Sequence, residues 1–179
     1  MMKVTSVLTC IMQRTSFANF KCPVARALDS VGDWWSIMIL RDAFQGLTRF
    51  DEFQKSLGVA PNILTRRLAH LVEAGLLQKR LYSDRPARHE YVLTETGQDF
   101  FPVLMALFSW GRRHVPEEDL AFLLGNADSG KERRTQLVDV ETGEELTPRN
   151  TCLLPGPAAE ESDRERIARA RAWYLGIDA

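Results

Sequence analysis

The sequence predicts an α+β fold, mainly α-helical with a small antiparallel β-wing, arranged as a winged helix-turn-helix. Two observations predict it. Apolar residues recur at helical spacing in four successive segments between Pro23 and Ala74. The spacing then shortens to that of two strands around a polar loop, and a long helical segment follows them.

The first two helices are bounded by residues typical of helix ends. We expect the first from Pro23 to about Val31, because proline suits the first helical position and Gly32 ends the segment. The second is expected over 34–44, with Asp33 as its N-cap and Gly46 just past its end. Apolar residues lie on nearly every side of this second helix, which predicts that it is buried.

The third and fourth helices form the predicted helix-turn-helix. Thr48 and Asp51 resemble a capping box with Asp in the usual place of Glu, so a short helix is expected over 49–57. A fourth helix is expected to begin at Pro61 and to run to about Ala74, with Gly75 as its C-terminal glycine.

The β-wing and one further helix complete the predicted unit. Strands are expected over 76–82 and 89–93, joined by a polar loop over 83–88. Thr94 can cap a long helix from Glu95 to about His114, and Pro102 is a candidate bend within it.

The fourth helix has the pattern of a DNA-recognition helix. At 100° per residue, Leu64, Leu68 and Leu71 share one face, which we expect to be buried. The opposite face and its flank then present Asn62, Thr65 and Arg66. Asn can bond adenine and Arg can bond guanine, each with about 1–3 kcal/mol of discrimination. The alternative is an ordinary solvated helix face.

Basic residues on the same helix and on the wing extend this candidate site. Arg67 points toward the core side, where it can reach either a carboxylate or a phosphate, and His70 could touch phosphate. Each wing cation alone could be a solubilising surface charge, but helix and wing together favour DNA. The candidate DNA-binding residues are Asn62, Thr65, Arg66, Arg67, His70, Lys79, Arg80, Arg85 and Arg88.

Several short motifs between Cys22 and His114 keep a recognisable order and spacing. They are Cys22-Pro23-Val24, Gly32-Asp33-Trp34-Trp35, Ile39-Leu40-Arg41-Asp42, Arg49-Phe50-Asp51-Glu52-Phe53, Leu64-Thr65-Arg66-Arg67-Leu68, Glu73-Ala74-Gly75-Leu76, Glu90-Tyr91-Val92-Leu93-Thr94-Glu95-Thr96-Gly97 and Trp110-Gly111. As a set they resemble an HxlR-type regulator, a subset of the MarR-like winged helices. The resemblance implies a homodimer joined by the first helix and the long helix after the wing. It also implies two recognition helices set for successive major grooves of a promoter.

Two departures from that family stand out. Ala60 occupies a position where members often have a capping Ser, and an uncapped start costs about 0.5–2 kcal/mol. Some members carry paired cysteines in a small zinc-ribbon-like hairpin of the tail, whereas the turn over 141–144 has no thiols. Cys152 alone cannot hold zinc, so we expect neither a structural metal nor a cofactor.

Two candidate inputs for a regulatory signal are present. Cys22 lies at the start of the first helix beside Lys21, where helix amides and cations favour a reactive thiolate, so it is a candidate redox sensor. The alternative is a small buried residue at the dimer interface. The second candidate is an apolar small-molecule effector bound between the dimer halves near Trp34, Trp35, Phe101 or Trp110. Aromatic residues at helical spacing are more often core.

We expect three parts in the chain, and charge separates the last of them from the first two. We expect a leader over 1–20, the winged domain over 21–116 and an acidic extension over 117–179 with a hairpin and a terminal helix from Ser162 to Leu175. Residues 1–116 hold 15 Lys and Arg against 10 Asp and Glu, a net charge of +5. Residues 117–179 hold 8 against 14, a net charge of −6. The basic part points to nucleic acid. Apolar residues of the terminal helix, among them Ile167, Ala170, Trp173 and Tyr174, suggest that it docks on the core or at the dimer interface.

These features predict a sequence-specific regulator of transcription that binds double-stranded DNA, with repression as the favoured sense. The alternative is a winged-helix module for protein contacts without DNA binding, and the retained Arg66, Arg85 and Arg88 count against it. An enzyme is not expected, because the chain has no HExxH motif, Gly-rich phosphate loop or nucleophile elbow. An odd number of scattered cysteines, no signal-peptide pattern and no apolar run long enough for a bilayer favour the cytoplasm and no membrane contact.

Overall fold

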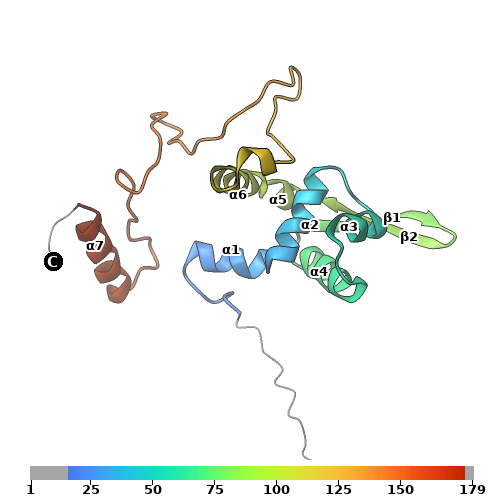
Figure 1. The fold of residues 1–179 in the computed structure, drawn as a ribbon. Helices are drawn as coiled ribbons and strands as arrows, with labels where there is room; N and C mark the ends of the chain where they lie inside the picture. Colours follow the sequence, from blue (N-terminus) through green and yellow to red (C-terminus); the bar gives the residue numbers. More distant parts are fainter. Residues whose placement is uncertain (1–15, 176–179) are drawn as a thin grey trace, which may run out of the picture.

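The structure, a computed structural model, describes residues 16–175, with side chains through 173. Helices dominate, and the two strands form one small sheet (Figure 1). The elements in chain order are α1 (Pro23–Val31), α2 (Trp34–Phe44), α3 (Phe50–Leu57), α4 (Pro61–Glu73), β1 (Leu77–Asp84), β2 (Ala87–Leu93), α5 (Glu95–Gln98), α6 (Phe101–His114), the 3₁₀ turn η1 (Glu117–Asp119) and α7 (Glu161–Leu175). The predicted fold class is confirmed.

The predicted start of α2 is confirmed and that of α3 is corrected. The Asp33 side chain accepts a hydrogen bond from the backbone N–H of Ser36 at 3.2 Å, as an N-cap does. In α3 the N-cap is Arg49, so the residue at the third helical position is Glu52 and not Asp51. The Glu52 carboxylate accepts from the backbone N–H groups of Thr48 and Arg49, both at 2.9 Å. These bonds hold the pKa of Glu52 below its usual range.

The wing is longer than predicted. β1 and β2 pair antiparallel from Leu77 opposite Leu93 to Asp84 opposite Ala87, with an irregularity between Leu81 and Ser83. Most of the expected polar loop over 83–88 is therefore strand. Polar composition was misleading here because the hairpin projects from the helices, so both of its faces meet solvent near the tip (Figure 1).

The long helix predicted after the wing is two helices. Pro102 lacks the N–H that would donate to the carbonyl of Gln98, so α5 ends at Gln98 and α6 starts at Phe101. The predicted cap is confirmed, since the Thr94 hydroxyl accepts from the Gly97 N–H at 3.0 Å. Gly97 has to be glycine because a Cβ there would lie 2.0 Å from the Leu76 carbonyl oxygen.

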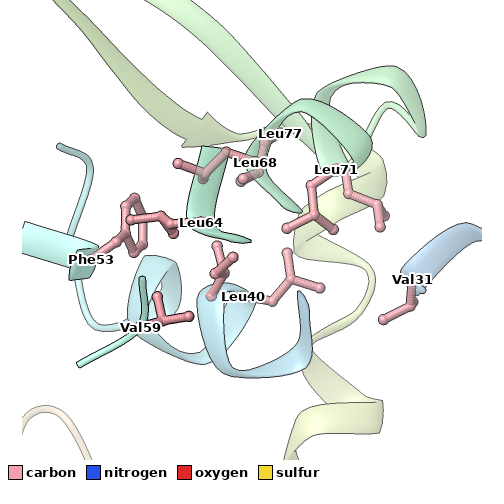
Figure 2. Packing of buried hydrophobic residues seen from close by; sticks show 10 residues of the cluster. Val31, Leu40, Phe53, Val59, Leu64, Leu68, Leu71 and Leu77 are labelled. Carbon is pink, nitrogen blue, oxygen red and sulfur yellow. The ribbon is translucent and has the colours of Figure 1, made fainter. Parts of the chain in front are cut away.

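The hydrophobic core lies where α2, α3, α4 and the base of the wing meet. Figure 2 shows Leu64, Leu68 and Leu71 of α4 turned toward this core together with Leu40 and Phe53. The three α4 leucines are all 0% exposed, which confirms their predicted inward face. Each such side chain stabilises the fold by about 1.5–3 kcal/mol.

The prediction that α2 is buried holds for part of the helix only. Ile39 and Leu40 are buried, but Trp34 at its start is 72% exposed. Val24 and Leu28 of α1 and Val103, Leu107 and Trp110 of α6 are exposed apolar residues as well.

The acidic extension follows α6 and then leaves the winged helix. Arg112 of α6 forms an ion pair with Glu132, and the following chain leads to α7, which lies on the side of the molecule away from the wing (Figure 1). The predicted terminal helix is confirmed, beginning at Glu161. Its Ile167 and Ala170 line a hollow with Leu146 and Leu153 of the extension. Glu160, just before α7, pairs with Lys21, just before α1, and docking of the terminal helix stays a prediction. Among residues 16–175, none of the helices combines the length and hydropathy that a membrane span requires.

Candidate nucleic-acid interface

Asn62, Thr65 and Arg66 form the outward face of α4. All three are exposed, while the leucines of the opposite face are buried. The Thr65 hydroxyl donates to the Pro61 carbonyl at 2.8 Å, and the Asn62 Oδ1 accepts from the Ile63 N–H at 2.9 Å. These local bonds leave the Asn62 amide N–H groups able to donate to a base. Arg66 has no ion-pair partner within the described residues, so its guanidinium can reach an external acceptor.

The start of α4 is uncapped, as the sequence predicts. Ala60 occupies the N-cap position with extended backbone and makes no side-chain hydrogen bond. Pro61 follows at the first helical position, where its missing N–H costs nothing.

Arg67 does not lie on this outward face. It forms an ion pair with Asp33, and the two side chains are 19% and 22% exposed. We expected Arg67 to reach either a carboxylate or a phosphate, and in the structure it reaches the carboxylate of Asp33. The pair joins the N-cap of α2 to the middle of α4, so Arg67 positions α4 against α2.

His70 also differs from expectation. Its ring packs against Gly32, where a Cβ would lie 3.1 Å from both His70 Cδ2 and His70 Nε2. The Nε2 atom is buried and has no hydrogen-bond partner among the described residues. The imidazole therefore faces the junction of α1 and α2, where Gly32 lies.

The wing carries three exposed cations without an ion-pair partner in the described part of the chain: Lys79, Arg85 and Arg88. Arg80 differs from them, because its Nε lies 2.8 Å from Glu90 Oε1 on the neighbouring strand. Its charge is therefore largely compensated before any partner binds.

A further cationic residue was missed by the sequence reasoning. The Arg49 guanidinium lies 4.8 Å from the centroid of the Tyr82 ring, in a cation–π contact. The contact depends on non-local pairing, since the Tyr91 N–H donates to the Thr48 carbonyl at 2.7 Å and Arg49 forms a β-bridge with Glu90. No local sequence signal reports that residues 48–49 join the edge of the wing.

The structure locates the residues of both candidate signal inputs. Cys22 is an exposed free thiol at the N-cap of α1. Its neighbour Lys21 is engaged by Glu160 at 2.5 Å, a contact that raises the pKa of Lys21. Phe101 contacts Phe44 at 5.2 Å between ring centroids, whereas Trp110 contacts His114 at 4.6 Å. The aromatic residues expected to surround an effector are thus shared between separate contacts.

No metal site emerges from the described residues: none of their His, Cys, Asp and Glu side chains form a group of three or more that could hold an ion.

Comparison with known proteins agrees with this geometry. The family model described as HxlR-like helix-turn-helix matches residues 30–119. Uncharacterised HTH-type transcriptional regulators of Mycobacterium bovis and Mycobacterium tuberculosis are each 41% identical over 135 residues, which cover 75% of this chain and 85% of theirs.

Two solved structures resemble the chain beyond the stretch matched by the family model. The candidate transcription factor PA1607 aligns with a TM-score of 0.72 and 42% identity over 79% of this chain and 100% of that one. The candidate transcription factor PA1374 of Pseudomonas aeruginosa aligns with a TM-score of 0.58 and 49% identity over 81% of this chain and 99% of that one.

Proposed function

Because this chain belongs to the HxlR-like helix-turn-helix family, we propose that it is a transcription regulator that binds double-stranded DNA as a homodimer through its winged helix-turn-helix. Its relatives are named as transcriptional regulators, which supports a regulatory and not an enzymatic role. Action in the cytoplasm is part of this proposal, because the DNA that it would bind lies there.

The observation that carries the proposal is the two-sided character of α4. Three leucines 0% exposed fix one face in the core, and Asn62, Thr65 and Arg66 are exposed on the other. A helix of 13 residues is about 20 Å long, which suits the major groove. Side chains held on a rigid helix can discriminate base edges, and each good bidentate pair contributes about 1–3 kcal/mol.

The wing supplies the second contact. Lys79, Arg85 and Arg88 are exposed and uncompensated within the described residues, so they can neutralise phosphates or enter the minor groove beside α4. Phosphate contacts hold the protein in register without reading sequence themselves. Arg67, His70 and Arg80 leave this set of direct contacts, since each is engaged by the protein itself.

The homodimer would form through α1 and α6. These helices lie on the side of the core away from the wing (Figure 1), and they expose Val24 by 68%, Leu28 by 53% and Trp110 by 60%. Soluble proteins rarely leave a large contiguous apolar surface uncovered. A partner that covers it with the same two helices would set two copies of α4 for successive major grooves, about 34 Å apart.

Repression is the sense of regulation that we propose, because a dimer seated across two grooves of a promoter covers DNA that RNA polymerase must contact. Cys22 is the proposed redox input, on the ground that its thiol is exposed at the proposed dimer helix. Treating the protein with diamide would test this role. Unchanged DNA affinity in the treated protein would remove Cys22 from the proposal.

The DNA-binding test is fluorescence anisotropy with a fragment from the region upstream of the protein's own gene, at several salt concentrations. We expect log K to fall linearly with log salt concentration, because bound phosphates release counterions. Arg66→Ala and Arg88→Ala should both weaken binding, whereas Arg164→Ala, an exposed arginine on the distant α7, should not. Binding that ignores salt and survives the first two substitutions would favour a winged helix used for protein contacts.

A further inference from the structure

We propose that the hollow between the first turn of α3 and the wing binds a phosphate group, with Arg49 as its principal cation. The hollow is lined by Arg49, Phe50, Asp51, Tyr82, Arg88 and His89. For a phosphate of the DNA backbone, the inference rests on the proposed function. A free phosphorylated ligand would present the same chemistry, and the test below separates the two sources.

The fold brings these groups together from the start of α3 and from both strands of the wing. Arg49 stands at the start of α3 and is held against β2 by its bridge to Glu90. Tyr82 comes from β1, at the irregularity where the pairing with β2 shifts. Arg88 belongs to β2, next to the turn of the hairpin. The hollow therefore exists only when the wing is folded against α3.

The Arg49 guanidinium is held in place without losing its hydrogen-bonding groups. Its contact with the Tyr82 ring, 4.8 Å from the centroid, restrains the side chain by stacking. An aromatic face takes up none of the five N–H donors, which remain in the planar arrangement that matches phosphate oxygens. A preorganised guanidinium loses less conformational entropy when an anion binds.

The nearby carboxylates are mostly committed to other partners. Glu90 pairs with Arg80 at 2.8 Å. Glu52 accepts from two backbone N–H groups, which lower its pKa most, and the Arg49 charge contributes least to that shift. Among the described residues, neither Arg49 nor Arg88 forms an ion pair, so two guanidinium groups and one carboxylate, that of Asp51, line the hollow.

Asp51 is the one group in the hollow that opposes an anion. Its carboxylate lies among the lining residues together with the imidazole of His89, which can donate a hydrogen bond. Substitutions of Arg49 and of Asp51 should therefore change phosphate affinity in opposite directions. Removing the charge of Arg49 should weaken phosphate binding, and removing the charge of Asp51 should strengthen it.

The test uses the full chain in two arms. In the first, the affinity for the upstream DNA fragment is measured by anisotropy at several salt concentrations. Arg49→Ala should weaken binding about tenfold and reduce the salt slope by about 0.9, the value of one phosphate contact. Tyr82→Leu should weaken binding less, Tyr82→Phe should preserve it, and Asp51→Asn should tighten it. Arg164→Ala is the matched control for the loss of one exposed charge.

In the second arm, inorganic phosphate is added to DNA-free protein, and the Arg49 Nε–H resonance is followed by NMR. A shift of this resonance at millimolar phosphate that is weakened in Tyr82→Leu, with DNA affinity unchanged in Arg49→Ala, would assign the site to a free phosphorylated ligand. Weaker DNA binding without such a shift would assign it to the DNA backbone.

Loss of DNA binding in Arg66→Ala with no change in Arg49→Ala, Asp51→Asn or the phosphate titration would overturn the phosphate site and leave the proposed function intact. If the wild-type chain binds no DNA, the proposed function fails and the phosphate titration alone decides the site. Circular dichroism of each variant confirms that it is folded.

Discussion

Asp33 shows how one side chain can support two helices at once. It caps α2 through the Ser36 N–H at 3.2 Å and forms an ion pair with Arg67 of α4. Both partners are about one-fifth exposed, so solvent screens their attraction only in part. The sequence left the partner of Arg67 open between a carboxylate and a phosphate. In the structure its charge helps to hold α4 against α2.

We predict that Asp33→Ala lowers the free energy of unfolding by about 1–3 kcal/mol, because both the cap and the ion pair are lost. Asp33→Asn should lower it less, since an amide oxygen can still cap α2. Urea denaturation of the two variants measures the difference. Equal stability of Asp33→Ala and the wild-type protein would show that this contact contributes nothing.

Gly32 and His70 provide a second prediction at the scale of single residues. Gly32 has φ +99°, and a Cβ there would lie 3.1 Å from the His70 ring and 3.3 Å from Ser36 Oγ. Gly32→Ala should therefore lower the free energy of unfolding by more than about 1 kcal/mol, from backbone strain and from crowding. In a His70→Ala background the crowding by the imidazole should disappear and that by Ser36 Oγ should remain, so the cost of Gly32→Ala should be smaller there. An identical cost in both backgrounds would mean that His70 does not press on Gly32.

Among the elements, α4 was the most predictable and the wing with its neighbours the least. The inward leucines and outward polar residues of α4 follow from helical periodicity alone, and the bounds of α1 and α2 follow from their caps. The capping pair of α3, the length of the wing and the division between α5 and α6 were not predicted correctly. In each case the outcome depends on backbone hydrogen bonds: those that Glu52 accepts, those that pair the strands of the wing, and the one that Pro102 cannot donate.

The candidate site was predictable to a similar extent. Asn62, Thr65 and Arg66 were found because one helix sets their directions. Arg49 was missed because its position depends on pairing with Glu90, which lies 41 residues along the chain. Arg67 and His70 lie nearest to other helices, so their partners were decided by tertiary packing.

The start of α4 gives a prediction at the scale of an element. Ala60 has φ −62° and ψ 139°, the extended backbone that an N-cap requires, but no side-chain acceptor. Ala60→Ser should raise the free energy of unfolding by about 0.5–2 kcal/mol by supplying that acceptor. Ala60→Val is the matched control, because it has no hydroxyl and should not stabilise. Thermal unfolding of both variants measures this, and equal melting temperatures for Ser and Val would contradict it.

At the scale of the whole molecule, charge and apolar surface are segregated. The wing projects to one side, and α1, α6 and the acidic extension lie on the other (Figure 1). This leaves the outward face of α4 uncovered by the chain's own acidic tail. The exposed apolar residues of α1 and α6 lie on this other side, where the proposed second copy would cover them.

We predict that Leu107→Glu, at a site 45% exposed on α6, shifts the protein toward monomer, because it places a charge in the proposed apolar interface. Analytical ultracentrifugation measures the shift. Leu81→Glu is the matched control, since Leu81 is 48% exposed but lies on the wing. Dimerisation that persists unchanged in Leu107→Glu would place the interface elsewhere.

In the proposed function, the outward face of α4 reads bases as one half of a symmetric pair. The most direct measurement is binding-site selection from random duplexes, with the wild-type protein and with Asn62→Ala and Arg66→Ala. We predict a palindromic site with half-sites centred about one helical turn, or a multiple of it, apart. Each substitution should erase preference at one or two symmetric positions. A selected site without this symmetry, or one whose base preferences are unchanged in both variants, would contradict the account.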